Sequence, residues 1–282
     1  MLRTRLILGT LSIGAIISLA WLDTALASSL GSGFVLFVLL GLLSAVGALE
    51  LSRMLQNIDI PSSPWVLILA ALIGLTSTIA PRLDPTLAQA WIVFPTSASF
   101  VLLLQAFDLI RRQHTEHSAS ALASSQLAMV YLGVLPAFYF LMCYEHDAYT
   151  VLIIVLITKS CDIGAYFIGT AVGRHKLIPW LSPAKSWEGL FGGMLTSGLV
   201  GALATMVLGG TLAVPVWYGG LIGLILGAVG QGGDLLESLL KRSTGVKDSG
   251  VVPGFGGVLD MIDSPIIVAP VAYWLLYVAP SL

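Results

Sequence analysis

Long apolar segments are the feature that most restricts what this chain can fold into. A bilayer core about 30 Å thick requires about 20 apolar residues per helix, and nine segments meet that length. Their approximate limits are residues 5–22, 32–52, 64–80, 88–109, 121–143, 148–170, 189–208, 214–233 and 265–280. Hydrophobic residues make up 57% of the chain and charged residues only 10%, unlike a soluble domain. The sequence therefore predicts an all-α, polytopic integral membrane protein with about nine transmembrane helices.

The first apolar segment has two interpretations. Arg3 and Arg5, the apolar run and the small residues Ala25-Leu26-Ala27 also fit a cleavable signal peptide. We favour an uncleaved span because the apolar run is long for a signal sequence. Both interpretations place residue 28 outside.

The positions of the cations predict the orientation, since Lys and Arg are enriched in cytoplasmic loops. With nine spans and the N-terminus inside, most cations fall inside: Arg3, Arg5, Arg53, Arg111, Arg112, Arg174, Lys176, Lys185, Lys241, Arg242 and Lys247. Only Arg82 falls outside, and Lys159 lies within a span. We therefore expect the N-terminus and the polar stretch 234–263 to be cytoplasmic.

The composition supports neither a nucleic-acid partner nor a site built from cysteines. No basic tail or mixture of basic and aromatic residues indicates a nucleic-acid partner. Cys143 and Cys161 are the only cysteines, and both lie in or at the edge of apolar segments. We expect them to be small core residues rather than a disulfide or a metal site.

Residues 230–264 contain five of the 15 acidic residues. If the preceding apolar helix continues through this stretch, Asp234, Glu237, Ser238 and Lys241 share one face, because they recur at steps of three and four. Carboxylates hold Mg²⁺, and neighbouring cations neutralise phosphate charge. This combination predicts phosphoryl or nucleotidyl transfer.

Four short motifs follow one another in this stretch: Gly233-Asp234-Leu-Leu-Glu237-Ser238-Leu-Leu-Lys241-Arg242, Gly245-Val-Lys247-Asp248, Pro253-Gly254-Phe255-Gly256-Gly257 and Asp260-Met261-Ile-Asp263-Ser264. Their order and spacing resemble the signature of the phosphatidate cytidylyltransferases, or CDP-diacylglycerol synthases. Two positions depart from it: the family usually has His where this chain has Phe255, and Arg where it has Met261. A non-catalytic relative of the family is therefore an alternative.

The sixth apolar segment contains Lys159 and Asp162, and ionisable groups at membrane depth are costly unless they are paired or face a polar cavity. An ion pair within the helix is the simplest explanation. The segment Asp162-Ile-Gly-Ala-Tyr-Phe167 also resembles an internal segment of the same enzyme family.

The loop after this segment contains Arg174, Lys176 and Lys185, which form a cationic patch suited to a triphosphate or an anionic lipid headgroup. A generic cytoplasmic anchor is the alternative. The run Ser182-Pro-Ala-Lys185-Ser-Trp-Glu-Gly resembles the family's inner loop, although the family commonly has a second Lys where this chain has Ala184. Ser182-Pro183 also predicts a helix start, as does Ser264-Pro265 before the last span.

The seventh and eighth segments are rich in glycine, and we expect these residues to form helix-packing faces rather than catalytic loops. For Gly232-Gly233, directly before Asp234, we expect a different function, because two glycines allow a helix bend or a close approach of phosphate to the backbone.

The resemblance implies attack by the phosphate of phosphatidic acid on the α-phosphorus of CTP, with Mg²⁺ as cofactor. As catalytic residues we expect Asp248, Lys247, Asp260 and Asp263. As substrate contacts we expect Lys241, Arg242, Lys185, Lys176, Arg174, Ser182 and Ser238. As metal ligands we expect Asp234, Glu237, Asp248, Asp260, Asp263 and Asp162.

We expect residues 1–120 to be membrane-anchoring helices and residues 121–282 to be the catalytic region. The predicted location is a bacterial inner membrane with a cytoplasmic site, and an organelle membrane is the alternative. The family resemblance implies a homodimer. One alternative is a CTP-dependent kinase of a polyprenol-type lipid, which would require a base for its hydroxyl nucleophile. A transporter is disfavoured, because the polar groups gather in one half of the chain rather than in matching positions of two halves.

Overall fold

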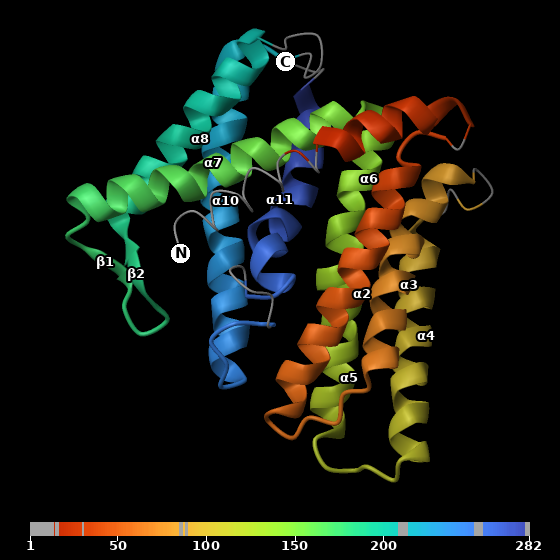
Figure 1. The fold of residues 1–282 in the computed structure, drawn as a ribbon. Helices are drawn as coiled ribbons and strands as arrows, with labels where there is room; N and C mark the ends of the chain where they lie inside the picture. Colours follow the sequence, from red (N-terminus) through yellow and green to blue (C-terminus); the bar gives the residue numbers. More distant parts are fainter. Residues whose placement is uncertain are drawn as a thin grey trace. The chain divides into compact units, whose positions relative to one another are not determined.

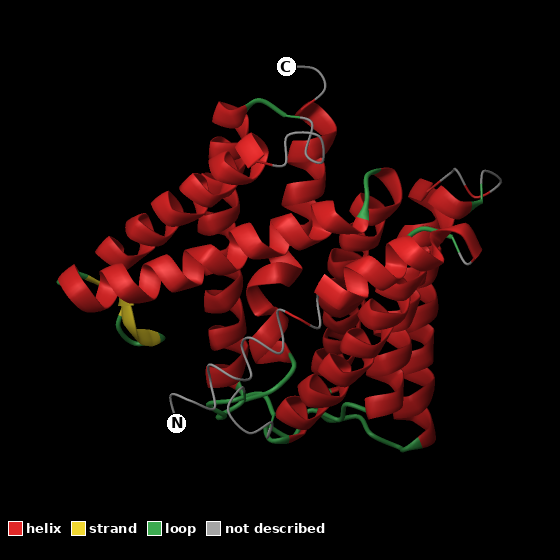
Figure 2. Ribbon diagram, turned by 45° about the horizontal axis from the view of Figure 1, so that its top comes forward, coloured by secondary structure: helices red, strands yellow, loops and turns green. Residues whose placement is uncertain are grey.

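Helices dominate the protein. A computed structural model describes residues 14, 17–29, 31–84, 87, 90–207, 214–250 and 256–279 (Figures 1 and 2). Within these residues, eight helices are long and apolar enough to cross a membrane. The prediction of an all-α, multi-pass membrane protein is thus confirmed. The first predicted span, 5–22, and Phe255 of the signature fall largely or wholly outside the described residues.

The elements follow one another in the order in which Figure 1 labels them. They are α2 (Phe34–Gln56), α3 (Pro64–Leu83), α4 (Ala90–Arg111), α5 (Ser118–Leu127), η2 (Ala128–Val134), α6 (Leu135–Glu145), α7 (Ala148–Val172), β1 (Lys176–Ile178), β2 (Ser182–Ser186), α8 (Trp187–Val207), α10 (Val216–Ser243) and α11 (Leu259–Val278). Helices α5, η2 and α6 form one continuous span, Ser118–Glu145.

The chain forms two compact units. The first comprises Met1–Leu36, Met142–Leu239 and Asp263–Leu282, and the second comprises Phe37–Leu141 and Leu240–Ile262. The predicted division near residue 120 concerns the roles of the segments and stays a prediction.

The second unit packs α2, α3, α4 and the α5–η2–α6 span together. Helix α3 meets the π-helical segment η2 at two glycines, because a Cβ at Gly74 would collide with the Met129 carbonyl and one at Gly133 with the Ala71 carbonyl. The Ser44 hydroxyl of α2 donates a hydrogen bond of 2.6 Å to the Leu132 carbonyl within η2. Small residues and a polar contact thus bring these helices close, as expected where lipid supplies no hydrophobic driving force between helices.

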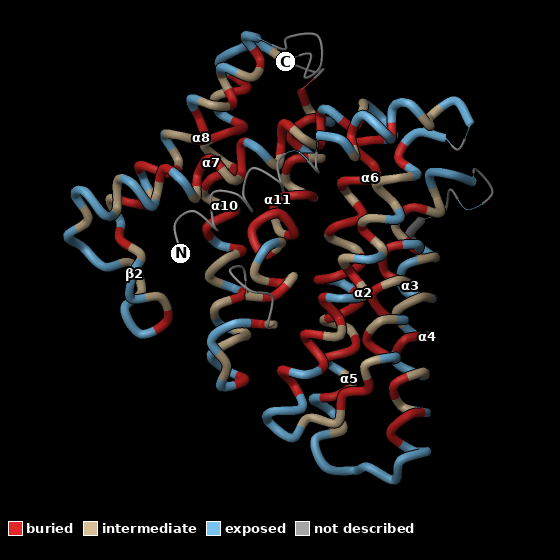
Figure 3. The backbone as a smooth tube through the Cα atoms, in the orientation of Figure 1, coloured by how far each residue is buried: buried red, intermediate tan, exposed pale blue. Residues whose placement is uncertain are grey.

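The first unit contains α7, α8, α10 as far as Leu239 and α11 from Asp263 onward. A Cβ at Gly223 of α10 would collide with the Ser197 carbonyl of α8, and one at Gly201 would collide with the Gly219 carbonyl. The prediction that these glycines form packing faces is confirmed. Cys143 and Cys161 are buried free thiols, as predicted (Figure 3 maps burial along the chain).

A two-stranded antiparallel hairpin, β1–β2, connects α7 to α8 and pairs Lys176 with Ser186 and Ile178 with Ser182 (Figure 2). The helix start predicted at Ser182-Pro183 is therefore wrong. Helix α8 begins at Trp187, where the Ser186 hydroxyl accepts a hydrogen bond of 3.1 Å from the Gly189 amide. Strand pairing across the loop overrides the local helix-start pattern.

Two helices extend beyond their predicted apolar spans. Helix α10 continues past residue 233 to Ser243, which confirms the prediction that Asp234, Glu237, Ser238 and Lys241 share one face. Helix α11 begins at Leu259, so the start predicted at Ser264-Pro265 is wrong and Pro265 lies inside the helix. The earlier start has a tertiary cause, because the carboxylate of Glu50 in α2 accepts hydrogen bonds from the Val258 and Leu259 amides at the start of α11.

Candidate active site

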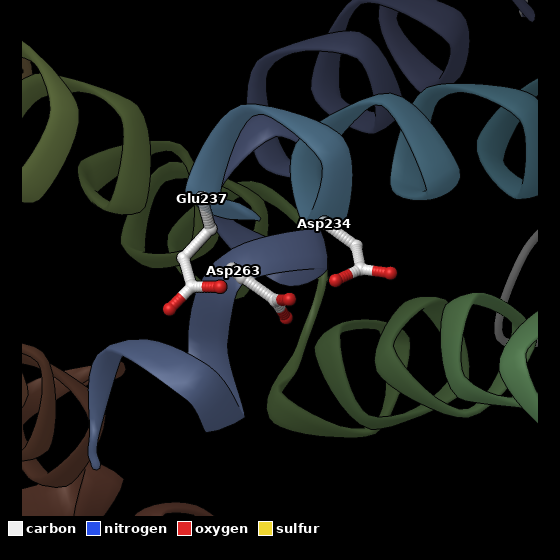
Figure 4. A group of neighbouring side chains, drawn as sticks. All are labelled: Asp234, Glu237 and Asp263. Carbon is white, nitrogen blue, oxygen red and sulfur yellow. The ribbon is translucent and has the colours of Figure 1, made fainter. Parts of the chain in front are cut away.

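Three carboxylates converge within the first unit. Asp234 and Glu237 project from successive turns of α10, and Asp263 projects from α11 (Figure 4). One carboxylate oxygen of each lies within 4.8 Å of the others. We call these residues the carboxylate cluster. Glu237 and Asp263 are buried, and Asp234 is half-buried.

A glycine allows this convergence. A Cβ at Gly233 would lie only 2.7 Å from the Asp263 carbonyl oxygen, so α10 can approach α11 this closely only without a side chain there. Gly232 has open space around it. Helix α10 continues through the pair as a helix, and the close approach of α11, which the sequence did not predict, explains Gly233. The approach of phosphate to this backbone stays a prediction.

Two lysines neutralise part of the charge. Lys185 of β2 forms an ion pair with Asp234, and its Nζ also lies 3.5 Å from the Gln231 carbonyl. Lys159 of α7 lies 3.4 Å from Asp162 and 3.9 Å from Asp263. Lys159 therefore forms the predicted pair within its helix and also reaches a member of the carboxylate cluster.

Asp162 belongs to the surroundings of the carboxylate cluster. Its Oδ1 accepts a hydrogen bond of 2.9 Å from Gln231 Nε2, and its Oδ2 faces Lys159. The Asp263 Oδ1 accepts a bond of 2.6 Å from the Ser264 amide. These contacts hold the carboxylates in place from three helices, α7, α10 and α11.

The donor set of the carboxylate cluster fits a hard divalent cation. Two unit charges 4.8 Å apart repel by about 3 kcal/mol at an effective dielectric constant of about 20, so three converging carboxylates favour a cation between them. Mg²⁺ binds oxygen at about 2.1 Å in octahedral geometry, so adjacent ligands lie about 3.0 Å apart and the three side chains would draw together to hold it. An oxygen-only donor set suits Mg²⁺.

Other predicted site residues lie in the second unit. Lys241 Nζ pairs with Asp260 Oδ1 at 2.5 Å. Asp260 Oδ2 accepts hydrogen bonds from the Gly257 amide at 2.7 Å, from the Ser249 amide at 2.9 Å and from the Ser249 hydroxyl at 3.0 Å. We call Lys241, Ser249, Gly257 and Asp260 the loop cluster. Asp260 therefore organises the loop between α10 and α11.

The remaining predicted residues of this loop lie at the surface. Lys247 and Asp248 are exposed, and Arg242 is exposed with Nη1 lying 3.5 Å from the Val246 carbonyl. Among the residues described, Asp248 and Asp260 do not join the carboxylate cluster. Met261, at a departure from the family signature, is 38% exposed.

The cationic loop of the first unit divides into two sites. Lys185 faces Asp234, whereas Arg174 and Lys176 line an open pocket of about 710 Å³. Its other lining residues are His175, Trp187, Glu188 and Phe191. The Glu188 carboxylate accepts a hydrogen bond from the His175 amide at 3.2 Å, which closes the hairpin onto α8. Ser182 lies in β2, opposite Ile178, and Ser238 is half-buried on α10.

Sequence reasoning missed Glu50 of α2, a buried carboxylate that contacts the loop between α10 and α11. Its signal was present, because Glu50 is an acidic residue inside an apolar span, and such residues tend to be functional. Lys159 and Asp162 carry the same signal in α7.

The fold and the site define a class: a multi-pass, all-α membrane protein in which three carboxylates converge beside two lysines. The profile of the Cytidylyltransferase family matches residues 4–279. The chain therefore belongs to the cytidylyltransferase family.

Individual relatives agree with this assignment. A phosphatidate cytidylyltransferase of Staphylococcus epidermidis is 35% identical over 208 residues, which are 70% of this chain and 79% of the relative. One of Staphylococcus aureus is 30% identical over 251 residues, 88% of this chain and 92% of the relative. One of Bacillus subtilis is 41% identical over 154 residues, 53% and 56% of the two chains. The resemblance inferred from the signature is confirmed.

Proposed function

We propose that this protein is an Mg²⁺-dependent phosphatidate cytidylyltransferase that converts CTP and phosphatidic acid to CDP-diacylglycerol and pyrophosphate. The observation that carries the proposal is the convergence of Asp234, Glu237 and Asp263 beside two lysines. Membership of the cytidylyltransferase family and the names of the relatives support it.

In the proposed reaction, a phosphate oxygen of phosphatidic acid attacks the α-phosphorus of CTP. The bond from that phosphorus to the oxygen that bridges to the β-phosphate breaks, and pyrophosphate leaves with the bonding electrons. A phosphate monoester is largely ionised near neutral pH, so the nucleophile needs no general base. The protein's task is to position the reactants and to neutralise charge.

The carboxylate cluster would hold Mg²⁺, with Asp162 in support. When bound, the metal neutralises phosphate oxygens and withdraws electron density from the phosphorus under attack. Lys185 pairs with Asp234 before substrate binds, and we propose that its ammonium group turns to the triphosphate of CTP. Lys159 stays as an internal counter-ion for Asp162 and Asp263.

The exposed cations of the loop, Lys247 and Arg242, are proposed contacts to the nucleotide, together with Asp248 as a further carboxylate. Ser238 of α10 is proposed as a hydroxyl contact and Ser182 as a contact from the hairpin. We assign Arg174 and Lys176 to the phosphate of phosphatidic acid, because exposed Trp187 and Phe191 share their pocket and aromatic residues favour the bilayer interface.

We further propose that the site faces the cytoplasm of a bacterial inner membrane, where CTP is available. The cation distribution supports this orientation, because 11 of the 13 Lys and Arg residues fall on the predicted cytoplasmic side. A homodimer remains our proposal for the assembly, and native mass spectrometry in detergent would test it.

The direct test is pyrophosphate release by the detergent-purified protein from phosphatidic acid and Mg-CTP, with CDP-diacylglycerol as the second readout. Asp263→Asn removes one ligand charge at nearly constant volume, so we expect turnover to fall by at least about 10²-fold. Asp59→Asn is the matched control. Asp59 is exposed with φ 58°, a conformation that Asn tolerates, and we expect unchanged turnover.

Turnover that requires both substrates and falls only in the Asp263 variant supports the proposal. A folded wild-type protein that forms no CDP-diacylglycerol would overturn it. Transfer of phosphate from CTP to a polyprenol by that preparation would instead identify a lipid kinase.

A further inference from the structure

Glu50 is a buried carboxylate whose polar contacts all lie about 200 residues away. It projects from the second half of α2 and is only 5% exposed. Its Oε1 accepts a hydrogen bond of 2.8 Å from the Val258 amide, and its Oε2 accepts one of 2.9 Å from the Leu259 amide. The Ser249 hydroxyl lies 3.0 Å from Oε2. All of these groups belong to the second unit.

These contacts make Glu50 the cap of a helix to which it does not belong. Val258 and Leu259 provide the first amides of α11, which have no partner within that helix. A carboxylate also interacts favourably with the positive end of the helix dipole. Such a cap is normally supplied by the residue that precedes the helix. Here it comes from α2, so it ties the loop between α10 and α11 to another transmembrane helix.

The chemistry of the contacts requires a carboxylate. All three partners of Glu50 are N–H or O–H donors, so both of its oxygens act as acceptors. An amide in its place would direct an NH₂ group at one of these donors. Leaving a buried donor unsatisfied costs about 1–3 kcal/mol, so Gln is a poor substitute despite its similar shape.

Ser249 connects Glu50 to the loop cluster. Its hydroxyl lies 3.0 Å from Glu50 Oε2 and 3.0 Å from Asp260 Oδ2, so its single proton is shared between two carboxylates. Asp260 in turn pairs with Lys241. A chain of direct contacts therefore runs from α2 through Ser249 and Asp260 to Lys241 at the end of α10.

Two glycines make room for this arrangement. A Cβ at Gly250 would lie 2.6 Å from Glu50 Oε1, and a Cβ at Gly257 would lie 2.6 Å from Glu50 Oε2 and 2.6 Å from the Gly250 amide nitrogen. The loop backbone thus closes around the Glu50 carboxylate. Gly257 of the signature has no room for a side chain, because Ser249 Oγ, Glu50 Oε2 and the Gly250 amide nitrogen would all lie within 2.6 Å of its Cβ.

We propose that Glu50 is a positioning residue for cytidylyltransfer, which fixes the start of α11, where Asp260 lies, and the loop that carries Lys247. It acts through Ser249 and the Val258 and Leu259 amides rather than by touching substrate. This inference rests on the proposed function for its catalytic part. Its structural part, anchoring of the loop by a carboxylate of α2, is measurable without turnover.

The experiment compares Glu50→Gln, Glu50→Asp and Ser249→Ala with the wild type, and Glu116→Gln is a control at an exposed position. For each folded, detergent-purified protein, kcat and the KM for CTP are measured with saturating phosphatidic acid and Mg²⁺. Hydrogen exchange of the Ser249, Val258 and Leu259 amides is followed by mass spectrometry in the absence of substrates.

For Glu50→Gln we expect kcat per folded molecule to fall by at least about tenfold, because small displacements of positioned groups reduce rates strongly. Exchange at the three amides should accelerate by about tenfold or more. Glu50→Asp keeps the carboxylate and should recover part of kcat and of the protection. Ser249→Ala removes only the bridging hydroxyl and should lower kcat with little effect on thermal stability.

A merely structural Glu50 gives a different result: Glu50→Gln lowers Tm or folded yield while kcat and KM per folded molecule stay at wild-type values. That result overturns the positioning role, as does equal exchange in wild type and variant. If Glu50→Gln does not fold, an unchanged kcat in Ser249→Ala overturns it. If the wild-type protein shows no turnover, the proposed function is rejected, and so is the role of Glu50 in catalysis. Amide exchange then tests only whether Glu50 anchors the loop between α10 and α11.

Discussion

Lys185 lies in strand β2 with its ammonium group against the Asp234 carboxylate. In this position the lysine reduces the negative charge of the carboxylate cluster before any cation binds. In the proposed reaction, the same ammonium group binds the triphosphate of CTP. In that reaction, one residue would therefore affect the affinity for Mg²⁺ and the affinity for CTP in opposite directions.

Replacing Lys185 should separate these two effects. Lys185→Met keeps most of the side-chain volume but removes the charge, so the carboxylate cluster becomes more negative. We expect the Mg²⁺ concentration for half-maximal activity to fall by a few-fold and the KM for CTP to rise by about tenfold, equivalent to about 1.4 kcal/mol. Steady-state pyrophosphate assays at varied Mg²⁺ and CTP measure both.

Arg111→Met serves as a control, because it removes a cation from an exposed helix end outside the site. If Lys185→Met changes both constants in the same direction, the ion pair with Asp234 does not set the metal affinity.

At the scale of helices, α10 and α11 determine the spacing of the carboxylates by their close approach at Gly233. A Cβ there would lie 2.7 Å from the Asp263 carbonyl oxygen, and a backbone atom cannot move as a flexible side chain can. The neighbouring Gly232 lies on the exposed face with nothing within 4 Å of an added Cβ. The two adjacent glycines thus offer a matched comparison.

Gly233→Ala should separate α10 from α11 and reduce turnover by at least about tenfold, with a destabilisation of about 1–3 kcal/mol from overpacking. Gly232→Ala should keep full activity and gain up to about 1 kcal/mol, because Ala favours helix more than Gly does. Thermal unfolding in detergent and pyrophosphate release measure the two effects. Equal behaviour of the two variants would show that close packing at Gly233 does not control the site.

At the scale of the whole molecule, the distribution of cations predicts the orientation in the membrane, and labelling of cysteines can test it. The native thiols make a labelling experiment simple, because Cys143 and Cys161 are 0% and 1% exposed and should give little background. His114 and His146 are exposed on two successive connections, which are separated by the span Ser118–Glu145.

We predict that a membrane-impermeant maleimide labels His146→Cys in intact cells. His114→Cys should react only after the cells are permeabilised, because Arg111 and Arg112 place its loop in the cytoplasm. The opposite pattern would invert the topology and move the proposed active site to the outer face.

Much of the architecture was predictable, because its causes are local. The length of each apolar segment defines a span, and the three- and four-residue spacing of Asp234, Glu237 and Lys241 defines one face of a helix whatever surrounds it. The residue types and order of the signature were sufficient to identify the family. These properties need only the neighbouring residues in the chain, so the sequence by itself determined them.

The tertiary structure decided which of these residues meet. Asp263 joins Asp234 and Glu237 because α10 and α11 pack closely at Gly233, whereas Asp260 joins Lys241 and Ser249. The start of α11 likewise depends on hydrogen bonds to Glu50, about 200 residues away in the chain, and the hairpin β1–β2 depends on pairing between its two strands. Such contacts form only when the helices pack, so they leave no periodic pattern in the sequence.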